Sequence, residues 1–277
     1  MQFRQTRNIE TRHGAVAIRD TEGQGPAVFF IHGNSSCSLV FEGQFEGPLA
    51  ERHRLVAMDL PGHGESADAG DPGRTYSMPS YAEAAADVLA SLDIADPVVL
   101  GWSLGGHIGI EMTHLLPGMR GLVITGTPPA GPGAEEVNVA FAQIPELAFA
   151  GTEDFSEEQV QTFARYIYSL TKPASAELVE AVRRTDGRAR QCMFADFLDP
   201  ASRLKPQIRS VASWPKPLAI IQGSDEPFMD LAYFDTLDYA NLWRGQVQVI
   251  EGCGHAPFLE RPEDYNPLLE AFLADLA

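Results

Sequence analysis

The feature that most constrains this chain is a short apolar run that leads directly into a glycine-flanked serine. Residues 97–100 read Pro-Val-Val-Leu, and Gly101-Trp102-Ser103-Leu104-Gly105 follows at once. Such a run is typical of a buried parallel strand. Apolar residues at a helical period then continue until Pro117. The segment therefore predicts a strand, a tight bend at Ser103 and a helix.

The residue pattern around this bend indicates a chemical role for the serine. Side chains two positions before and after Ser103 would collide with neighbouring backbone, so Gly101 and Gly105 fit there. The bend exposes the hydroxyl, and the free N–H groups at the start of the helix point to where negative charge would form. This is the context of a G-x-S-x-G nucleophile elbow. The alternative is that Ser103 only caps the helix.

A second loop offers the partner that a nucleophilic serine needs for its oxyanion. The apolar run at 27–31 predicts a buried strand, and it ends in His32-Gly33-Asn34-Ser35-Ser36. Two backbone donors must aim at one oxygen, and we expect the N–H groups of Leu104 and Asn34 to be these donors. The alternative is an ordinary polar turn in which Ser35 or Ser36 caps a helix.

An acid and a base follow later in the chain. Asp225 and Glu226 come directly after the strand predicted at 217–222, and an acid there would orient a histidine and stabilise its imidazolium form. Neighbouring loop residues point in different directions, so only one of the two can do this. Of the seven histidines, His255 alone lies in a glycine-flanked loop after the last predicted strand. It is the expected general base.

The Pro- and Gly-rich stretch at 126–133 marks a domain boundary. From there to about Trp214 the pattern is helical, without a clear strand. We therefore predict a core of residues 1–126 and 213–277, and a helical cap of residues 127–212 that covers Ser103. The frequent aromatic residues of the cap indicate an apolar pocket roof. The pocket candidates are Trp102, which could also merely pack, Phe163 and Tyr166.

The remaining elements are predicted from periodicity and from turn residues. His13 and Gly14 indicate a hairpin, and a helix over 80–92 would be capped by Ser80 with Glu83 completing a capping box. We expect Asp59 to end a strand and His63 to hold its loop, because a triad histidine belongs later in the chain. Further expected elements are a weak helix over 39–50, a surface loop over 68–74 and a closing helix over 268–276.

Composition excludes several classes of function. The formal charge is −18, from 38 acidic and 20 basic residues, so the average surface repels nucleic acids and anionic membranes. The three cysteines lack metal-ligand spacing and are typical of reduced thiols in a cytoplasmic protein. No apolar run reaches 18 residues, so we expect no membrane insertion. The oligomeric state is not indicated.

The order Ser103, acid, His255 on alternating strands and helices resembles the α/β-hydrolase superfamily over the full length of the chain. The resemblance implies the α/β-hydrolase fold, a mostly parallel central sheet flanked by helices with a helical cap inserted after strand 6. The register of the acid in that superfamily favours Glu226, with Asp225 as the alternative. A serine nucleophile argues against the dehalogenase and epoxide-hydrolase branches, which use aspartate, and leaves acyl transfer.

A closer resemblance rests on motifs outside the superfamily signature. Thr125-Gly-Thr-Pro-Pro129, Arg184-Thr-Asp-Gly-Arg-Ala-Arg190 and Asp225-Glu-Pro-Phe228, together with the motifs above, look like the metal-independent N-acyl-homoserine lactonases that quench quorum signals. The resemblance implies a Ser-His-Glu triad, a small acyl ester or lactone substrate with an apolar tail, and neither a metal nor a cofactor. The alternatives are a general carboxylesterase, a carbon–carbon bond hydrolase of the same fold, and a small-molecule receptor on a hydrolase scaffold.

Overall fold

The computed structural model describes residues 5–276, and its centre is an eight-stranded sheet in the order β1-β2-β4-β3-β5-β6-β7-β8. The strands from β4 to β8 are parallel, whereas β2 is antiparallel to both of its neighbours, β1 and β4. The predicted fold class is confirmed. The strands are β1 Arg7–Thr11, β2 Gly14–Asp20, β3 Ala27–Ile31, β4 Arg54–Met58, β5 Val98–Trp102, β6 Gly121–Thr125, β7 Leu218–Gly223 and β8 Gln248–Ile250.

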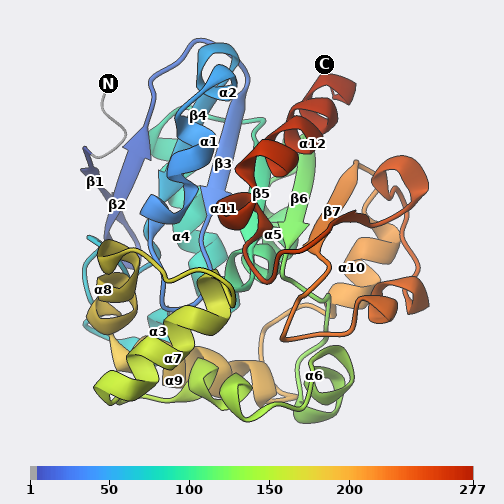
Figure 1. Cartoon of the computed structure of the whole chain (residues 1–277). Coiled ribbons are helices and arrows are strands. Elements are labelled where there is room, and N and C mark those ends of the chain that lie inside the picture. Colours follow the sequence, from blue (N-terminus) through green and yellow to red (C-terminus); the bar gives the residue numbers. More distant parts are fainter. Residues whose placement is uncertain (1–4, 277) are drawn as a thin grey trace.

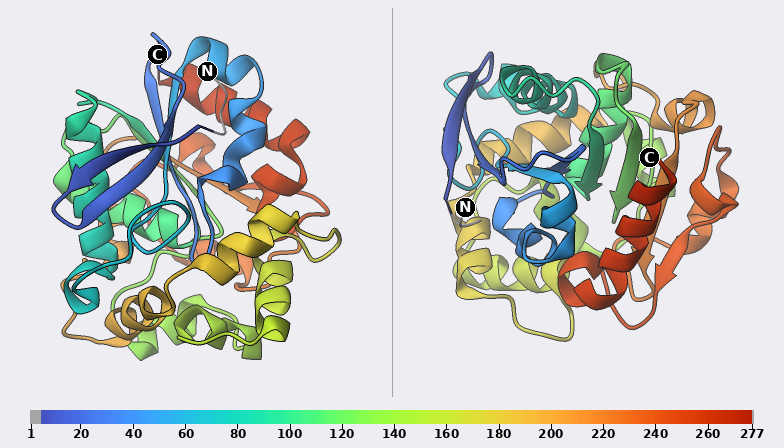
Figure 2. Two further views of the ribbon diagram at one scale, coloured as in Figure 1. Left: turned by 90° about the vertical axis from the view of Figure 1, so that its left-hand side faces the viewer. Right: turned by 90° about the horizontal axis from the view of Figure 1, so that it is seen from above.

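The central strands are buried along their whole length because helices cover both faces of the sheet. Every residue of β5, β6 and β7 is buried, which explains their continuous apolar sequences. Helices α4 (Met78–Ser91) and α5 (Leu104–Leu115) pack together on one face. The other face carries α1 (Glu42–Phe45) and α12 (Pro262–Asp275), as Figures 1 and 2 show. The sheet is therefore the middle of three layers.

Several helix boundaries differ from the predictions, mostly where proline starts a helix. Helix α4 begins at Met78 with Pro79 in its first turn, and its N-cap is Ser77, not Ser80. Helix α12 begins at Pro262 rather than at residue 268. Proline fits the first turn, where the backbone N–H has no intrahelical partner. The apolar pattern alone therefore placed both starts too late.

Two other predictions were too simple. The weak helix expected over 39–50 is three short pieces, η1 (Ser38–Phe41), α1 and α2 (Pro48–Arg52), and the break at Gly47 has a φ of 151°. The surface loop expected over 68–74 leads into a short helix, α3 (Pro72–Thr75), whose first turn is capped by the Asp71 carboxylate. A cap and a proline thus suffice for one turn of helix.

A helical segment separates β6 from β7, and no strand occurs within residues 127–214, as predicted. The cap helices, as we call them, gather at one end of the sheet (Figure 1), and they are α6 Ala134–Ala140, η2 Pro145–Gly151, α7 Glu157–Tyr168, α8 Ala176–Arg184 and α9 Gly187–Leu198. Helix α10 (Gln207–Ser213) packs against α5 and brings the chain back to the sheet. Consecutive parallel strands need such a crossover, and this one is unusually long.

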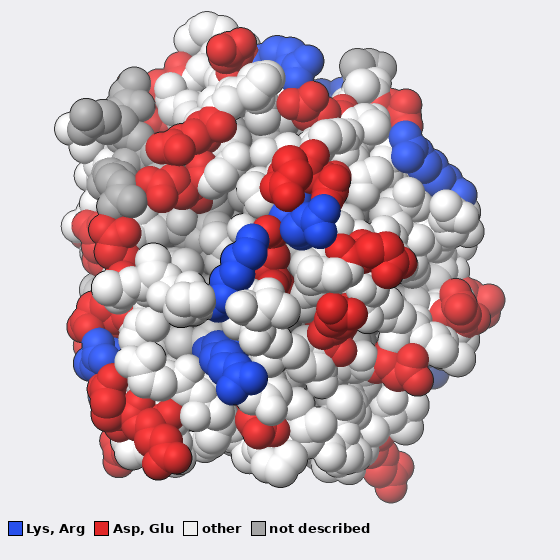
Figure 3. Space-filling view, in the orientation of Figure 1, with Lys and Arg blue, Asp and Glu red and all other residues white. Residues whose placement is uncertain are grey.

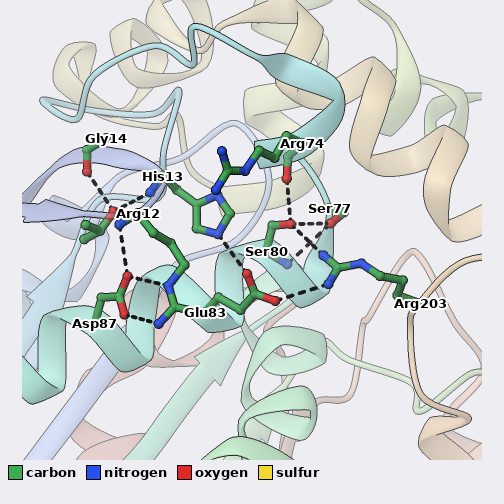
Figure 4. Close-up of polar contacts among 10 residues, drawn as sticks. Arg12, His13, Gly14, Arg74, Ser77, Ser80, Glu83, Asp87 and Arg203 are labelled. Carbon is green, nitrogen blue, oxygen red and sulfur yellow. Dashed lines mark hydrogen bonds and ion pairs between the residues drawn. The ribbon is translucent and has the colours of Figure 1, made fainter.

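A polar network fastens the β1–β2 turn to α4 (Figure 4). Arg12 forms a bidentate ion pair with Asp87, and His13 Nε2 lies 3.1 Å from Glu83 Oε2. Arg203, from the segment after α9, reaches the same Glu83 at 3.2 Å. Glu83 therefore binds side chains of other elements and does not complete a capping box.

The surface agrees with the acidic composition. Asp and Glu side chains are scattered over the face shown in Figure 3, with Lys and Arg side chains between them. None of the helices within residues 5–276 is long and apolar enough to cross a membrane.

Candidate active site

Ser103 lies at the bend between β5 and α5, in a backbone conformation that few residues other than glycine adopt. Its φ is 54° and its ψ is −121°. The bend needs both flanking glycines. A Cβ on Gly101 would lie 2.2 Å from Gly105 O, and a Cβ on Gly105 would lie 2.0 Å from Ile31 O. The strained bend presents the Ser103 side chain above the end of β5.

His255 and Glu226 are held together beside this bend. His255 Nδ1 lies 2.9 Å from Glu226 Oε1 and 2.8 Å from Oε2, and the two side chains are 3% and 1% exposed. A carboxylate only accepts, so Nδ1 carries the proton and donates it, which leaves the Nε2 lone pair available in the neutral ring. The backbone carbonyl of His255 also accepts a 2.8 Å bond from Trp102 Nε1. The ring is therefore fixed in one tautomer.

The two adjacent carboxylates have different surroundings. Glu226 points inward to His255, and its Oε1 also accepts a bond from the backbone N–H of Phe228. Asp225 is exposed and accepts a hydrogen bond from the Ser224 hydroxyl at 3.0 Å. The structure thus brings Glu226, and not Asp225, to the histidine.

Ser103 and His255 line the same cavity as the two expected oxyanion donors, Asn34 and Leu104. Within residues 5–276, the Ser103 hydroxyl makes no hydrogen bond, so its bond to His255 Nε2 is not formed in this state. Such bonds often tighten only when substrate is present. The backbone N–H groups of Asn34 and Leu104 find no acceptor among the described residues either. Both donors are therefore free for a ligand.

Three consecutive residues of the loop after β3 bind the cap helices. Asn34 Nδ2 donates to Ala150 O at 2.9 Å, and the Ser36 hydroxyl accepts from Tyr168 at 3.0 Å. Between them, the Ser35 hydroxyl accepts from Arg190 Nη1 at 3.3 Å. The loop that presents the expected oxyanion donor is thus shared between the sheet and the cap.

Arg190 is a buried cation without a carboxylate partner among the described residues. It donates to the carbonyl oxygens of Thr152 and Glu153 at 2.7 Å each, and its guanidinium lies 4.0 Å from the centre of the Phe155 ring. Burial lowers the pKa of Arg190 to about 10, which still leaves it charged at neutral pH. Arg190 therefore ties the segment after η2 to the loop at Ser35.

The cavity has a volume of about 60 Å³ in this structure, and most of the side chains that line it are apolar. The expected pocket residues Trp102 and Phe163 line it, and Trp102 also packs against His255. Tyr166 does not line it. The cavity-facing side of α7 carries Phe163 and Ile167. The Tyr166 ring instead packs beside Phe228, with 6.1 Å between the ring centroids, and the neighbouring Glu146 carboxylate raises the pKa of the Tyr166 hydroxyl.

Other lining residues were not predicted as pocket residues. Most are apolar and come from the cap helices, and one, His107, lies one turn after Ser103 on α5. Phe141, Phe194 and Phe197 belong to the cap aromatics that we expected as a group to form the pocket roof. The lining residues without any prediction are Met78, His107, Leu147, Ala150, Ile167, Met193 and Phe228. The aromatic richness of the cap was a signal for the group but not for its members. For His107 the available signal was its spacing of four from Ser103, which places two helix residues on one face.

Asp59 and His63 have structural contacts, as expected. Asp59 accepts hydrogen bonds from the backbone N–H groups of Ser38 and Glu65, and His63 Nδ1 lies 3.1 Å from Pro61 O. Burial lowers the pKa of His63 far below its usual value, so the ring is neutral. All three cysteines are free thiols, and residues 5–276 contain no cluster of His, Cys, Asp and Glu that could hold a metal ion.

Comparisons with known proteins agree with this architecture. The model of the alpha/beta hydrolase family matches residues 28–268. A crystal structure of the N-acyl homoserine lactonase AidH complexed with N-butanoyl homoserine is 46% identical in sequence, with a TM-score of 0.93. The match covers 99% of this chain and 97% of that chain.

Two further matches extend the comparison. A mutant of AidH complexed with N-hexanoyl homoserine lactone is 45% identical, with a TM-score of 0.93, over 99% of this chain and 98% of that chain. The pimeloyl-(acyl-carrier protein) methyl ester esterase of Nitrosomonas europaea is 25% identical over 260 residues, which are 91% of this chain and 97% of the esterase. The two similar proteins are thus an N-acyl homoserine lactonase and a methyl ester esterase.

Proposed function

The chain belongs to the alpha/beta hydrolase family, and from that premise we propose that it is a serine hydrolase that opens the ring of N-acyl-homoserine lactones and so quenches quorum signals. The resemblance seen in the sequence motifs is confirmed, and the comparisons support a hydrolase of esters or lactones. The choice of a lactone as the substrate is the more specific part of the proposal. It is supported by the 46% identity to a lactonase over 99% of this chain.

One observation carries the catalytic part of the proposal. A serine at a strained bend, a histidine held by a buried glutamate and two free backbone N–H groups all face one apolar cavity. Each group has the chemistry that acyl transfer needs, namely a nucleophile, a base with its lone pair available, and donors for an oxyanion.

In the proposed mechanism, Ser103 Oγ attacks the lactone carbonyl carbon while His255 Nε2 takes the hydroxyl proton. Glu226 stabilises the imidazolium that forms. The N–H groups of Asn34 and Leu104 donate to the oxyanion of the tetrahedral intermediate. The ring C–O bond then breaks, and His255 returns the proton to the departing oxygen. Water, deprotonated by His255, attacks the acyl-serine and releases the N-acyl-homoserine and the free Ser103 hydroxyl.

A lactone poses a problem for this mechanism, because its leaving alcohol stays tethered and can re-close the ring. Direct attack of water, with His255 as base and without an acyl-enzyme, is the second route. Mass spectrometry after rapid quenching separates the two. An adduct on Ser103 that carries the mass of the whole substrate supports the covalent route, and its absence during turnover supports direct attack.

The proposed function is tested by mass spectrometry of a medium-chain N-acyl-homoserine lactone incubated with the protein and with Ser103→Ala. We expect the substrate to gain one water, to re-close on acidification, and to stay intact with the variant. The rate should fall by a factor on the order of 10³ or more, because the nucleophile is lost. Release of free homoserine lactone would instead mean amide cleavage and would overturn the proposal.

The second candidate is a general carboxylesterase, favoured by the similarity to a methyl ester esterase. It shares the proposed chemistry and differs in what the cavity accepts. Cleavage of p-nitrophenyl esters without any lactone opening would select this candidate. Tight binding of a small ligand without turnover would select a receptor on a hydrolase scaffold.

A further inference from the structure

His107 is the polar residue of the cavity wall to which the proposed mechanism gives no task. The other polar lining side chains are Asn34, Ser103 and His255. His107 lies on α5, and its backbone N–H donates to Ser103 O at 3.3 Å, so it sits one helical turn beyond the nucleophile. Its ring is 6.0 Å from Phe141 and 5.2 Å from Phe197, centroid to centroid, and both phenylalanines line the cavity.

The hydrogen bonds of Gln207 fix which nitrogen of His107 carries the proton. Gln207 Nε2 donates to the His107 carbonyl oxygen at 3.2 Å, and Gln207 Oε1 accepts from the backbone N–H of Ala130 at 3.5 Å. These two contacts set the orientation of the amide. Its Oε1 then lies 2.7 Å from His107 Nδ1, so Nδ1 is protonated and donates. Nε2 is left with a lone pair.

This Nε2 has no hydrogen-bond partner among the described residues, and it is still accessible. The fully buried side-chain atoms that lack a partner belong to other residues, among them His13, His63 and Tyr81. Burial lowers the pKa of His107 to about 4, so at neutral pH the ring stays neutral. Nε2 therefore offers the cavity an acceptor and no donor.

We infer that His107 is a specificity-determining residue that accepts a hydrogen bond from a hydroxyl group on the acyl chain of the substrate. An apolar chain that extended from Ser103 along Phe141 and Phe197 would pass the His107 ring, which contacts both phenylalanines. A chain hydroxyl donates to Nε2. An unsubstituted chain displaces water from Nε2 and donates no hydrogen bond in its place. A keto oxygen places a second hydrogen-bond acceptor next to Nε2, which is unfavourable.

The inference rests on the proposed function in one respect, that the substrate is an acyl ester or lactone. It predicts that the wild-type protein prefers N-(3-hydroxyacyl)-homoserine lactone to the unsubstituted and 3-oxo lactones of equal chain length. The preference in kcat/KM should be about five- to tenfold, the ratio that one neutral hydrogen bond supplies. In His107→Phe this ratio should fall to about one.

The matched control is Phe141→Leu, which alters the same wall and keeps the acceptor, so the ratio should survive there. No preference in the wild type, or a preference that persists in His107→Phe, overturns the inference. An equal loss of kcat/KM for all three substrates in His107→Phe also overturns the inference. Such a loss would mean that Nε2 accepts from the amide N–H that the three substrates share.

Two further measurements apply if the protein does not open lactones or if His107→Phe does not fold. The same ratio is measured with hydroxylated and unsubstituted p-nitrophenyl esters, so that failure of lactone opening alone does not decide it. If His107→Phe does not fold, the ¹⁵N resonance of His107 Nε2 is followed in Ser103→Ala. A hydroxylated ligand should shift it and an unsubstituted ligand should not; equal shifts would refute the inference.

Discussion

The direction of the side chain determines which of two neighbouring carboxylates contacts His255. Asp225 and Glu226 have the same charge and lie next to each other on the loop after β7. Only Glu226 reaches His255, with both carboxylate oxygens within 2.9 Å of Nδ1. Asp225 stays exposed at the surface. A pair of single substitutions can therefore separate orientation of the histidine from local charge.

We predict that Glu226→Gln lowers kcat by a factor on the order of 10³ to 10⁴, because an amide can donate to Nδ1 and favour the wrong tautomer. Asp225→Asn removes the same charge one residue away and should change kcat by less than about twofold. Steady-state kinetics on any cleaved ester or lactone measures both. Comparable losses in the two variants would show that charge, not orientation, matters at this loop.

The sequence predicted which polar groups meet at the cavity better than it predicted the apolar walls around them. Ser103 and His255 follow strands in a fixed order, and the register of the acid selected Glu226 over Asp225. The pocket depends on which side of each cap helix faces inward, and the aromatic pattern does not determine this. Phe163 and Tyr166 both looked suitable, yet only Phe163 lines the cavity.

At the scale of elements, the close approach of α5 to β3 sets the position of the bend. A Cβ on Gly105 would meet the backbone of Ile31 and His32, at 2.0 Å from Ile31 O and 2.7 Å from His32 O. Backbone atoms cannot rotate out of the way as a side chain can. The first turn of α5 would have to move, and the expected oxyanion donor, Leu104 N–H, lies in that turn.

We predict that Gly105→Ala destabilises the protein by about 3 kcal/mol, the cost of overpacking a filled site, and reduces turnover in the fraction that folds. Gly70→Ala is the control, because Gly70 is exposed and an added Cβ there meets nothing within 4 Å. Urea unfolding curves give the stabilities. If Gly105→Ala were as stable as Gly70→Ala, this result would contradict the close approach of α5 to β3.

The elements that the sequence predicted best are those whose environment is uniform. Strands β5, β6 and β7 are buried on both faces, so an apolar run suffices to locate them. The segment 38–52 was harder, because its three short pieces are set by Gly47 and Pro48 and by contacts with α11 (Pro257–Glu260) and α12, distant in sequence. Local periodicity carries no information about those contacts.

At the scale of the whole molecule, Glu111 makes stability depend on pH. This residue of α5 is buried, and its Oε1 accepts a 2.9 Å bond from the backbone N–H of Lys205, just before α10. Burial raises the pKa of Glu111 from 4.5 to about 7. The unfolded chain therefore loses this proton at lower pH than the folded protein. The contribution of Glu111 to stability is complete below the unfolded pKa and is lost as the pH rises to the folded pKa.

We predict that Glu111→Gln unfolds at higher urea concentration than the wild type near about pH 8, by a free energy on the order of 1–3 kcal/mol. The amide keeps an acceptor for the Lys205 N–H. The advantage should vanish near about pH 4, where the wild-type carboxyl is protonated in both states. The exposed Glu10→Gln serves as control. A gain that is the same at both pH values would rule out ionisation as its cause.

The attachment of the loop at Asn34, Ser35 and Ser36 to Ala150, Arg190 and Tyr168 bears on how such proteins can be recombined. An insertion between two strands looks like a module that one protein could take from another. Here the inserted helices hold the loop at Asn34, which lines the cavity beside Ser103, so a transplanted segment that lacks these three partners would leave that loop unsupported. Chimaeras and natural exchanges of this segment must therefore carry the partners along, or change the receiving loop at the same time.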